Sequence, residues 1–99
     1  MKNDFIGKYV IVRCRDAGVH AGVLVDAKNR WASLDHARRL WSWQAITGHT
    51  LSGVARYGID HNKSKIAGPV RILLTETCEI IQTSNVAEDS IRTAPEYKA

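Results

Sequence analysis

The chain has 99 residues, which fits one domain and leaves no room for two. Apolar residues make up 44% of it and charged residues 24%, an ordinary globular composition. The net charge of +4 is uneven, because residues 1–71 hold twelve Lys and Arg against five Asp, whereas residues 72–99 hold two basic against five acidic residues. A basic body with an acidic end favours an anionic partner, or an end that folds back onto the body.

The two cysteines and four histidines carry no metal or redox pattern. Cys14 and Cys78 do not form a C-x-x-C pair, and no histidine lies three to five residues from another. We therefore expect free thiols, no metal and no cofactor. The first residues do not resemble a signal peptide, and no apolar run approaches the roughly 20 residues of a membrane span. These features predict a cytoplasmic protein that does not enter a membrane.

The N-terminal third predicts a meander of strands. Residues 9–14 are rich in β-branched and aromatic side chains and predict the first strand. A turn at residues 16–18 leads to a second strand at 19–26, and Gly22 inside it indicates a bulge or sharp bend. A third strand at 31–34 contains Trp31, which we expect in the core or at an interface, and a kink follows at residues 35–36.

Residues 37–43, with the sequence Ala-Arg-Arg-Leu-Trp-Ser-Trp, form the most unusual segment. As a strand, this segment places Arg39, Trp41 and Trp43 on one face and Arg38 on the other. As a helix, it would set the two tryptophans about 200° apart. The preceding meander favours the strand.

The second half predicts one helix and two further strands. Residues 50–58 predict a short helix with Thr50 as its N-cap and Gly58 as its end. Residues 60–68 are polar and basic and predict a loop. Strands are expected at 69–74 and 78–82, and a turn of helix at 86–91 within the polar end.

These elements predict a mainly β (α+β) fold. The two architectures that fit are a small SH3-like or Sm-like barrel and a twisted antiparallel sheet, each with one short helix. We expect a single β-rich domain at residues 1–84, followed by a polar, acidic C-terminal tail at residues 85–99.

The segment 37–43 is also the best candidate for ligand binding. Guanidinium groups hold phosphate, and indole rings stack on nucleotide bases. Burial of the tryptophans in the core is the alternative, which we favour for one of Trp41 and Trp43. Arg13 and His20 are expected near the same surface, although a solvated charged face would also explain the arginines. The predicted ligand-binding residues are Arg13, His20, Arg38, Arg39, Trp41 and Trp43.

Catalytic motifs are missing from the sequence. It contains no G-x-S-x-G, no phosphate-binding glycine-rich loop and no paired-carboxylate motif. Cys78 with a distant histidine is a nucleophile–base combination that the sequence leaves open, but a structural cysteine is the commoner case. We therefore expect no enzyme and assign no catalytic residues.

Two motifs resemble a family of small bacteriophage-encoded proteins of unassigned function. These motifs are V-R-x-x-x-A-G-V-H-x-G, which begins at Val12, and A-R-R-x-W-x-W, which begins at Ala37. The resemblance spans roughly residues 6–82. It implies a phage origin and, by analogy with other small phage proteins, a role against host defence.

Composition, segment 37–43 and the resemblance together lead to a functional expectation. We expect a homo-oligomeric anti-defence sponge that sequesters a nucleotide-derived immune signal, of the cyclic oligonucleotide or cyclic ADP-ribose type, without cleaving it. A protein–protein inhibitor of a host defence factor is the first alternative, because Trp and Arg are enriched at binding hot spots. A small basic nucleic-acid-binding barrel is the second, and nucleic acid is the less favoured partner.

Overall fold

A computed structural model describes residues 4–97 of the chain. Its main feature is one six-stranded antiparallel sheet, in which β4, β3, β2, β1 and β6 follow one another and β5 also pairs with β3. The strands are β1 (Tyr9–Cys14), β2 (Val19–Lys28), β3 (Trp31–Ser42), β4 (Lys65–Ile66), β5 (Val70–Leu74) and β6 (Thr77–Gln82). The expected mainly β fold is therefore confirmed.

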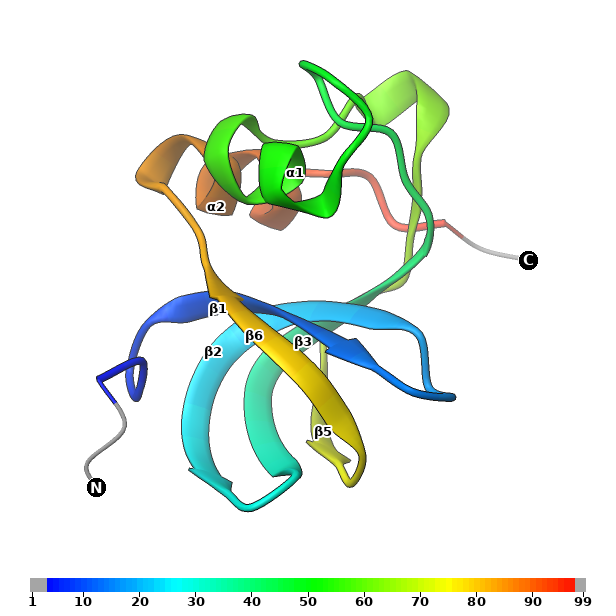
Figure 1. The fold of residues 1–99 in the computed structure, drawn as a ribbon. Coiled ribbons are helices and arrows are strands. Elements are labelled where there is room, and N and C mark those ends of the chain that lie inside the picture. The colour runs from blue at the N-terminus through cyan, green and yellow to red at the C-terminus, as the bar shows by residue number, and fades with distance from the viewer. Residues whose placement is uncertain (1–3, 98–99) are drawn as a thin grey trace.

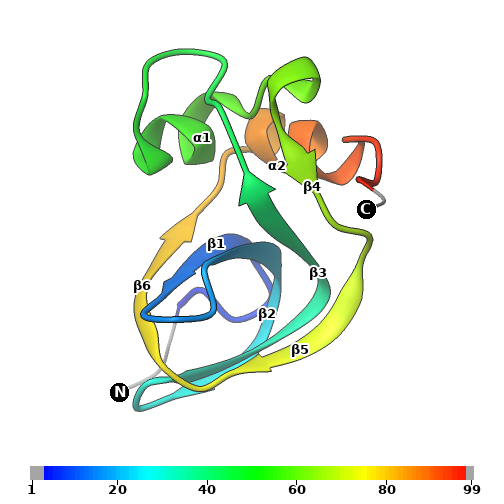
Figure 2. The ribbon, with the colours of Figure 1, turned by 90° about the vertical axis from the view of Figure 1, so that its right-hand side faces the viewer.

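The sheet curls strongly without closing into a barrel. In the described residues β5 pairs only with β3 and β6 only with β1. The free edges of β5 and β6 therefore do not pair with each other, and the sheet stays open between them. Figure 2 shows the five longer strands bent around a common interior. Of the two expected architectures, the twisted antiparallel sheet is the one that forms.

Bulges at two predicted positions bend the long strands. The β2–β3 register shifts between Ala21 and Val23, which confirms the bulge at Gly22. A Cβ atom on Gly22 would lie 2.9 Å from the Asp35 carbonyl oxygen, so the two strands approach too closely there for a side chain. The kink expected at residues 35–36 is confirmed by the positive φ of 52° at His36. β3 nevertheless continues through it as one strand of 12 residues.

Each face of the sheet packs part of its surface against a separate apolar cluster. One cluster, which we call the helix-side cluster, contains Ile11, Ala21 and Leu40 and packs under the helices. The other, the curl-side cluster, contains Val12, Leu24 and further residues enclosed by the curl. Alternate residues of β1 thus enter opposite cores, which explains why β1 is apolar almost throughout.

Two helices lie side by side over one end of the sheet (Figure 1). α1 (Leu51–Tyr57) begins after Thr50, whose hydroxyl accepts a hydrogen bond from the Gly53 backbone nitrogen, and ends at Gly58, as the sequence predicts. α2 (Asn85–Arg92) is capped by Ser84 and is a full helix rather than a single turn. The structure therefore has two short helices where one was expected.

The segments expected to be irregular are partly ordered. Within residues 60–68, a 3₁₀ turn, η1 (His61–Lys63), precedes the short strand β4. Of the expected C-terminal tail, the part up to residue 97 is described. Its Ala87 is buried, and its Ile91 and Ala94 are part of the helix-side cluster. Residues 98 and 99 lie outside the described chain. None of the helices in the part of the chain that is described is long and apolar enough to cross a membrane.

Candidate functional site

Arg39 and Trp41 form a stacked pair on β3. The guanidinium carbon of Arg39 lies 3.8 Å from the centre of the Trp41 ring, which is 59% exposed. Alternation along β3 places both side chains on one face, as the sequence predicts. The pair joins a cation to a large, solvent-facing aromatic surface.

Trp43 does not join this pair. β3 ends at Ser42, after an irregularity in its pairing with β4, and Trp43 packs half-buried against the helix-side cluster. Strict alternation beyond the end of the strand was therefore the wrong basis for placing Trp43 beside Trp41. Of the two tryptophans, Trp41 is the exposed one and Trp43 the packed one.

His20 is a buried residue of β2 that lies beside Arg39 on the same face of the sheet. It is 2% exposed, and its register places it between Val12 of β1 and Arg39 of β3. Its Nε2 atom donates a hydrogen bond to the Ala17 carbonyl oxygen at 2.8 Å. Burial lowers the pKa of His20, with a smaller contribution from the Arg39 charge against the opposing effect of that hydrogen bond. The neutral ring thus holds the turn over which Arg39 lies.

Arg38 points to the opposite face and binds backbone. It is 5% exposed, and its Nε donates to the Ala67 carbonyl oxygen at 2.8 Å. Its Nη1 donates to the carbonyl oxygens of Ile91 at 2.8 Å, Ala94 at 2.7 Å and, more weakly, Arg92 at 3.3 Å. These carbonyls lie at and just after the end of α2, where the last carbonyl groups lack donors within the helix, although the Ile91 oxygen also accepts from the Ala94 nitrogen at 3.3 Å. The guanidinium therefore fastens α2 to the sheet.

Arg13 is exposed at the outer part of β1, on the side of the sheet away from His20. Its Nε forms an ion pair with Glu79 Oε1 of β6 at 2.8 Å. Its register partner Val19 packs on the helix-side cluster, whereas the register partner of Arg39 is His20, which lies opposite Val12 of the curl-side cluster. The structure thus brings Arg39, Trp41 and His20 together and leaves Arg13, Arg38 and Trp43 elsewhere.

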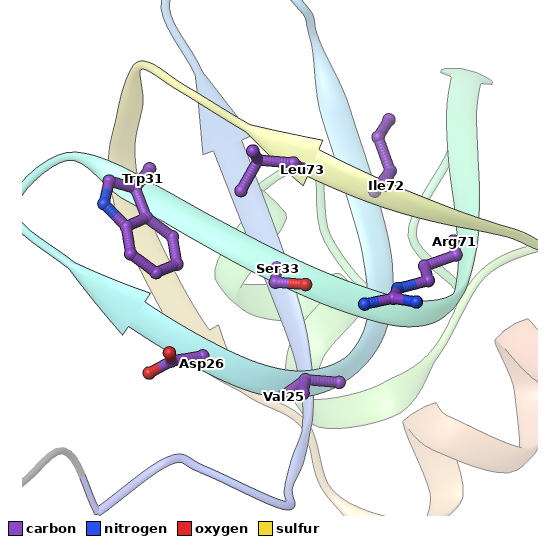
Figure 3. A pocket seen from close by; sticks show the side chains of 7 residues that line it. All are labelled: Val25, Asp26, Trp31, Ser33, Arg71, Ile72 and Leu73. Atoms are coloured by element: carbon purple, nitrogen blue, oxygen red, sulfur yellow. The ribbon is translucent and has the colours of Figure 1, made fainter.

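A hollow that the sequence did not predict lies on the outer surface of β2, β3 and β5. We call it the Trp31–Arg71 hollow. Its volume is about 550 Å³, and it is lined by Val25, Asp26, Trp31, Ser33, Arg71, Ile72 and Leu73. Figure 3 shows the Trp31 ring at one end and Arg71 at the other, with Ser33 between them. Its size falls within the range typical of small-molecule sites.

The polar groups of this hollow are available to a ligand. Arg71 is exposed and, within residues 4–97, takes part in no ion pair or hydrogen bond. Asp26 is also exposed, and its Oδ1 accepts a bond only from the adjacent Ala27 nitrogen at 2.9 Å. The remaining floor is apolar, with Val25 48% and Leu73 59% exposed. An aromatic ring, an unpaired cation and a hydroxyl thus surround an apolar floor.

Alternation along residues 70–74 was the available signal for this hollow. It sends Arg71 and Leu73 outward, since Leu74 and Ile72 face the curl-side cluster. The register that sets Leu73 opposite Ser33, and so places Trp31 and Arg71 at the two ends of one hollow, lies in the β3–β5 pairing. Residues 40 positions apart meet there, which a local pattern does not reveal.

Metal chemistry finds no support in the described ranges. Between residues 4 and 97, no three His, Cys, Asp or Glu side chains are grouped so that they could hold a metal ion. Cys14 is buried and Cys78 exposed, and both are free thiols. Burial raises the pKa of the Cys14 thiol, so this cysteine is a poor nucleophile.

The fold and its surfaces define a small, mainly β domain with exposed aromatic–arginine pairs. The chain belongs to the family described as a domain of unknown function, DUF6948, whose pattern matches residues 7–91. This agrees with the expected membership in a family of unassigned function. Neither the curated proteins nor the solved structures contain a match to the chain.

Proposed function

We propose that this protein binds a small phosphate-bearing nucleotide in the Trp31–Arg71 hollow and holds it without cleaving it. The observation that carries the proposal is the placement of an indole ring and an unpaired guanidinium at opposite ends of one hollow of about 550 Å³ (Figure 3). A base stacked on Trp31 gains roughly 1–3 kcal/mol. A phosphate on Arg71 gains charge-assisted hydrogen bonds, which are about twice as strong as neutral ones.

The chemistry of the hollow favours a nucleotide over a simple anion. Asp26 and Ser33 supply an acceptor and a hydroxyl for sugar or base groups, between the sites for base and phosphate. The excess of basic residues in the body of the chain attracts an anion from a distance. In this proposal, the protein is a phage-encoded sponge that sequesters a nucleotide-derived immune signal in the host cytoplasm.

Self-association is part of the same proposal. The hollow is shallow, and β5 at its border exposes Val70 and Leu73 on a strand whose outer edge is unpaired in the described chain. A second copy placed there would cover the bound nucleotide. Light scattering of the purified protein, with and without nucleotide, measures this directly.

The test compares the two aromatic–arginine pairs of the chain. Wild type is titrated by calorimetry with cyclic dinucleotides, cyclic trinucleotides and cyclic ADP-ribose isomers. We expect one of them to bind, with a loss of at least tenfold in affinity for Arg71→Ala and Trp31→Ala, and no change for Arg39→Ala and Trp41→Ala. Binding that is lost in the second pair alone would move the site to Arg39 and Trp41.

Two further readouts separate sequestration from the other functions. The bound nucleotide, released by heating the complex, should have its original mass, since hydrolysis would indicate an enzyme. Affinity should fall only mildly with salt, whereas binding to DNA or RNA falls steeply. No binding of any nucleotide in the panel by wild type would reject the proposal for these signals.

A second candidate function rests on Arg39 and Trp41. The Trp41 ring of this pair is exposed, and the pair does not line the Trp31–Arg71 hollow, which suits contact with a protein better than enclosure of a small molecule. A host defence protein is the partner expected from the sequence. Loss of its capture by Trp41→Ala, with capture retained by Trp31→Ala, would support this function.

A further inference from the structure

A small hollow on the helix side of the sheet has an unusual lining. It lies between β1, the bulge of β3 and the end of α2, and its volume is about 110 Å³. The lining residues are Tyr9, His36, Arg38, Pro69 and Arg92. Two are arginines and one is a histidine, and none is acidic.

Arg38 brings an uncompensated charge to this hollow. Its guanidinium is bound to backbone carbonyl oxygens through Nε and Nη1, and none of the ion pairs among residues 4–97 includes it. The second amino group, Nη2, has no hydrogen-bond partner in the described chain. Among the described residues, the Tyr9 hydroxyl is the sole side-chain nitrogen or oxygen that is both fully buried and without a partner. Since Nη2 has no partner, it must therefore be in contact with solvent. Nη2 is therefore a free cationic donor at the hollow.

Arg92 adds a second cation. Its Nε is paired with Glu88 Oε2 at 2.8 Å, which leaves its terminal amino groups to other partners. Its guanidinium carbon lies 4.7 Å from the centre of the Tyr9 ring. With one carboxylate for two guanidinium groups, the region is net positive, and burying an unbalanced charge is costly.

The Tyr9 hydroxyl is the second, independent sign of a missing partner. Tyr9 is 5% exposed, and its hydroxyl has neither a hydrogen-bond partner nor contact with solvent. A buried donor without an acceptor destabilises the fold. Burial raises the pKa of Tyr9 to about 12, against the opposing charges of Arg92 and Arg38, so the hydroxyl remains a donor at neutral pH.

Backbone strain occurs at the rim of the same hollow. His36 has a φ of 52°, in the left-handed region that a residue with a side chain rarely adopts, and its ring is exposed. The strain falls where the β3–β5 register shifts between Leu34 and Ala37. Strained residues of this kind often lie at ligand sites.

We propose that this hollow is an oxyanion site that takes a single phosphate or sulfate group. Its volume suits one tetrahedral anion and is too small for a nucleoside. Arg38 Nη2, the Arg92 amino groups and the His36 ring donate to the anion. An oxygen of the anion is also the acceptor that the Tyr9 hydroxyl lacks. The site is independent of the Trp31–Arg71 hollow, because it uses none of the same residues.

The experiment measures the melting temperature in sodium phosphate, sodium sulfate and sodium chloride at equal ionic strength. Both anions stabilise folded proteins in general by exclusion from their surface, and an anion that binds only the folded state adds to this. We therefore expect phosphate and sulfate to raise the melting temperature above its value in chloride by more in wild type than in Arg92→Ala. Calorimetric titration with inorganic phosphate gives the dissociation constant. Arg92→Ala and His36→Asn should each weaken phosphate binding at least tenfold. Asn is chosen at position 36 because it tolerates a positive φ, so the backbone of the variant keeps its conformation.

The chain contains a matched control for Arg92. Arg56 of α1 also lies over a tyrosine ring, with its guanidinium 5.1 Å from the centre of Tyr57. Arg56→Ala should leave phosphate binding unchanged. Tyr9→Phe should raise the melting temperature in chloride and shrink the additional rise in phosphate.

Two outcomes would overturn the proposal. One is an equal melting temperature in all three salts, and the other is a phosphate effect that survives both Arg92→Ala and His36→Asn. Adenosine 5′-monophosphate, titrated into Arg71→Ala so that the Trp31–Arg71 hollow does not contribute, distinguishes the source of the phosphate group. Tighter binding than inorganic phosphate would show that the group belongs to a nucleotide, and equal or weaker binding that the free anion is the natural occupant.

Discussion

Arg38 and Arg39 are consecutive residues whose guanidinium groups lie on opposite faces of β3. Arg38→Ala should lower the free energy of unfolding by at least about 3 kcal/mol, because it removes a charged donor from carbonyl oxygens at the end of α2 and from that of Ala67. Arg38→Lys should recover little of this loss, because an ammonium group lacks the planar fork that reaches both segments. Urea unfolding measures both variants.

Arg39→Ala is the control at the neighbouring position. Its guanidinium stacks on the exposed Trp41 ring, and such contacts contribute about 0.5–1 kcal/mol at exposed sites. We therefore expect a loss of at most about 1 kcal/mol. Equal losses at the two positions would show that Arg38 does not fasten α2 to the sheet.

At the scale of elements, the two helices differ in what their N-caps hold. The Thr50 hydroxyl accepts one hydrogen bond, from the Gly53 nitrogen, and serves α1 alone. The Ser84 hydroxyl accepts from the Ala87 nitrogen at 3.1 Å and also donates to the Arg56 carbonyl oxygen at 2.7 Å, which ties α2 to α1. Thr50→Ala should cost about 1 kcal/mol, and Ser84→Ala about twice as much.

Denaturant unfolding of the two cap variants tests this order. Ser52→Ala is the matched control, because Ser52 is exposed inside α1, where alanine is the better helix former. It should leave stability unchanged or slightly raised. A Ser84→Ala loss no larger than that of Thr50→Ala would contradict the second hydrogen bond as a link between the helices.

Local patterns predicted the elements better than their partners. Thr50 and Gly58 marked both ends of α1, and Gly22 and residues 35–36 marked the bends, because caps and bulges depend on a few neighbouring residues. α2 was underestimated, since Ala87 and Ile91 are its only buried residues and the rest of its sequence is polar apart from the exposed Val86. Its stability comes from packing and from Arg38, more than 50 positions away in the chain.

The candidate sites depended even more on distant contacts. The adjacent arginines suggested one ligand surface, but the arrival of α2 on the far side of β3 engages Arg38 with backbone. The hollow between Trp31 and Arg71 exists only once β3 and β5 pair in their actual register. Arg39 and Trp41, two positions apart on one strand, were the part of the surface that alternation could predict.

At the scale of the whole molecule, one sheet carries an apolar cluster on each face. Three buried side chains in or beside these clusters have a pKa that burial shifts. His20, Cys14 and Tyr9 are all buried, and burial shifts the pKa of each toward its neutral form. The unfolded thiol and phenol lose their protons near their ordinary pKa values of 9.0 and 10.0, whereas the folded protein keeps them protonated to higher pH. Stability should therefore decline above about pH 9, and more steeply above pH 10.

On the acid side, His20 sets the decline. Its pKa is lowered in the folded protein, so at pH values just below its ordinary 6.5 the unfolded chain binds a proton that the folded protein does not. The free energy of unfolding should then fall as the pH drops below about 6.5, by up to about 1.4 kcal/mol per pH unit, until the pKa of the folded state is reached. In His20→Gln, the amide still donates to the Ala17 carbonyl oxygen but does not titrate, so this slope should disappear. Urea unfolding between pH 5 and 8 compares the two proteins. A variant that kept the wild-type slope would place the acid sensitivity outside the buried face shared by His20 and Arg39.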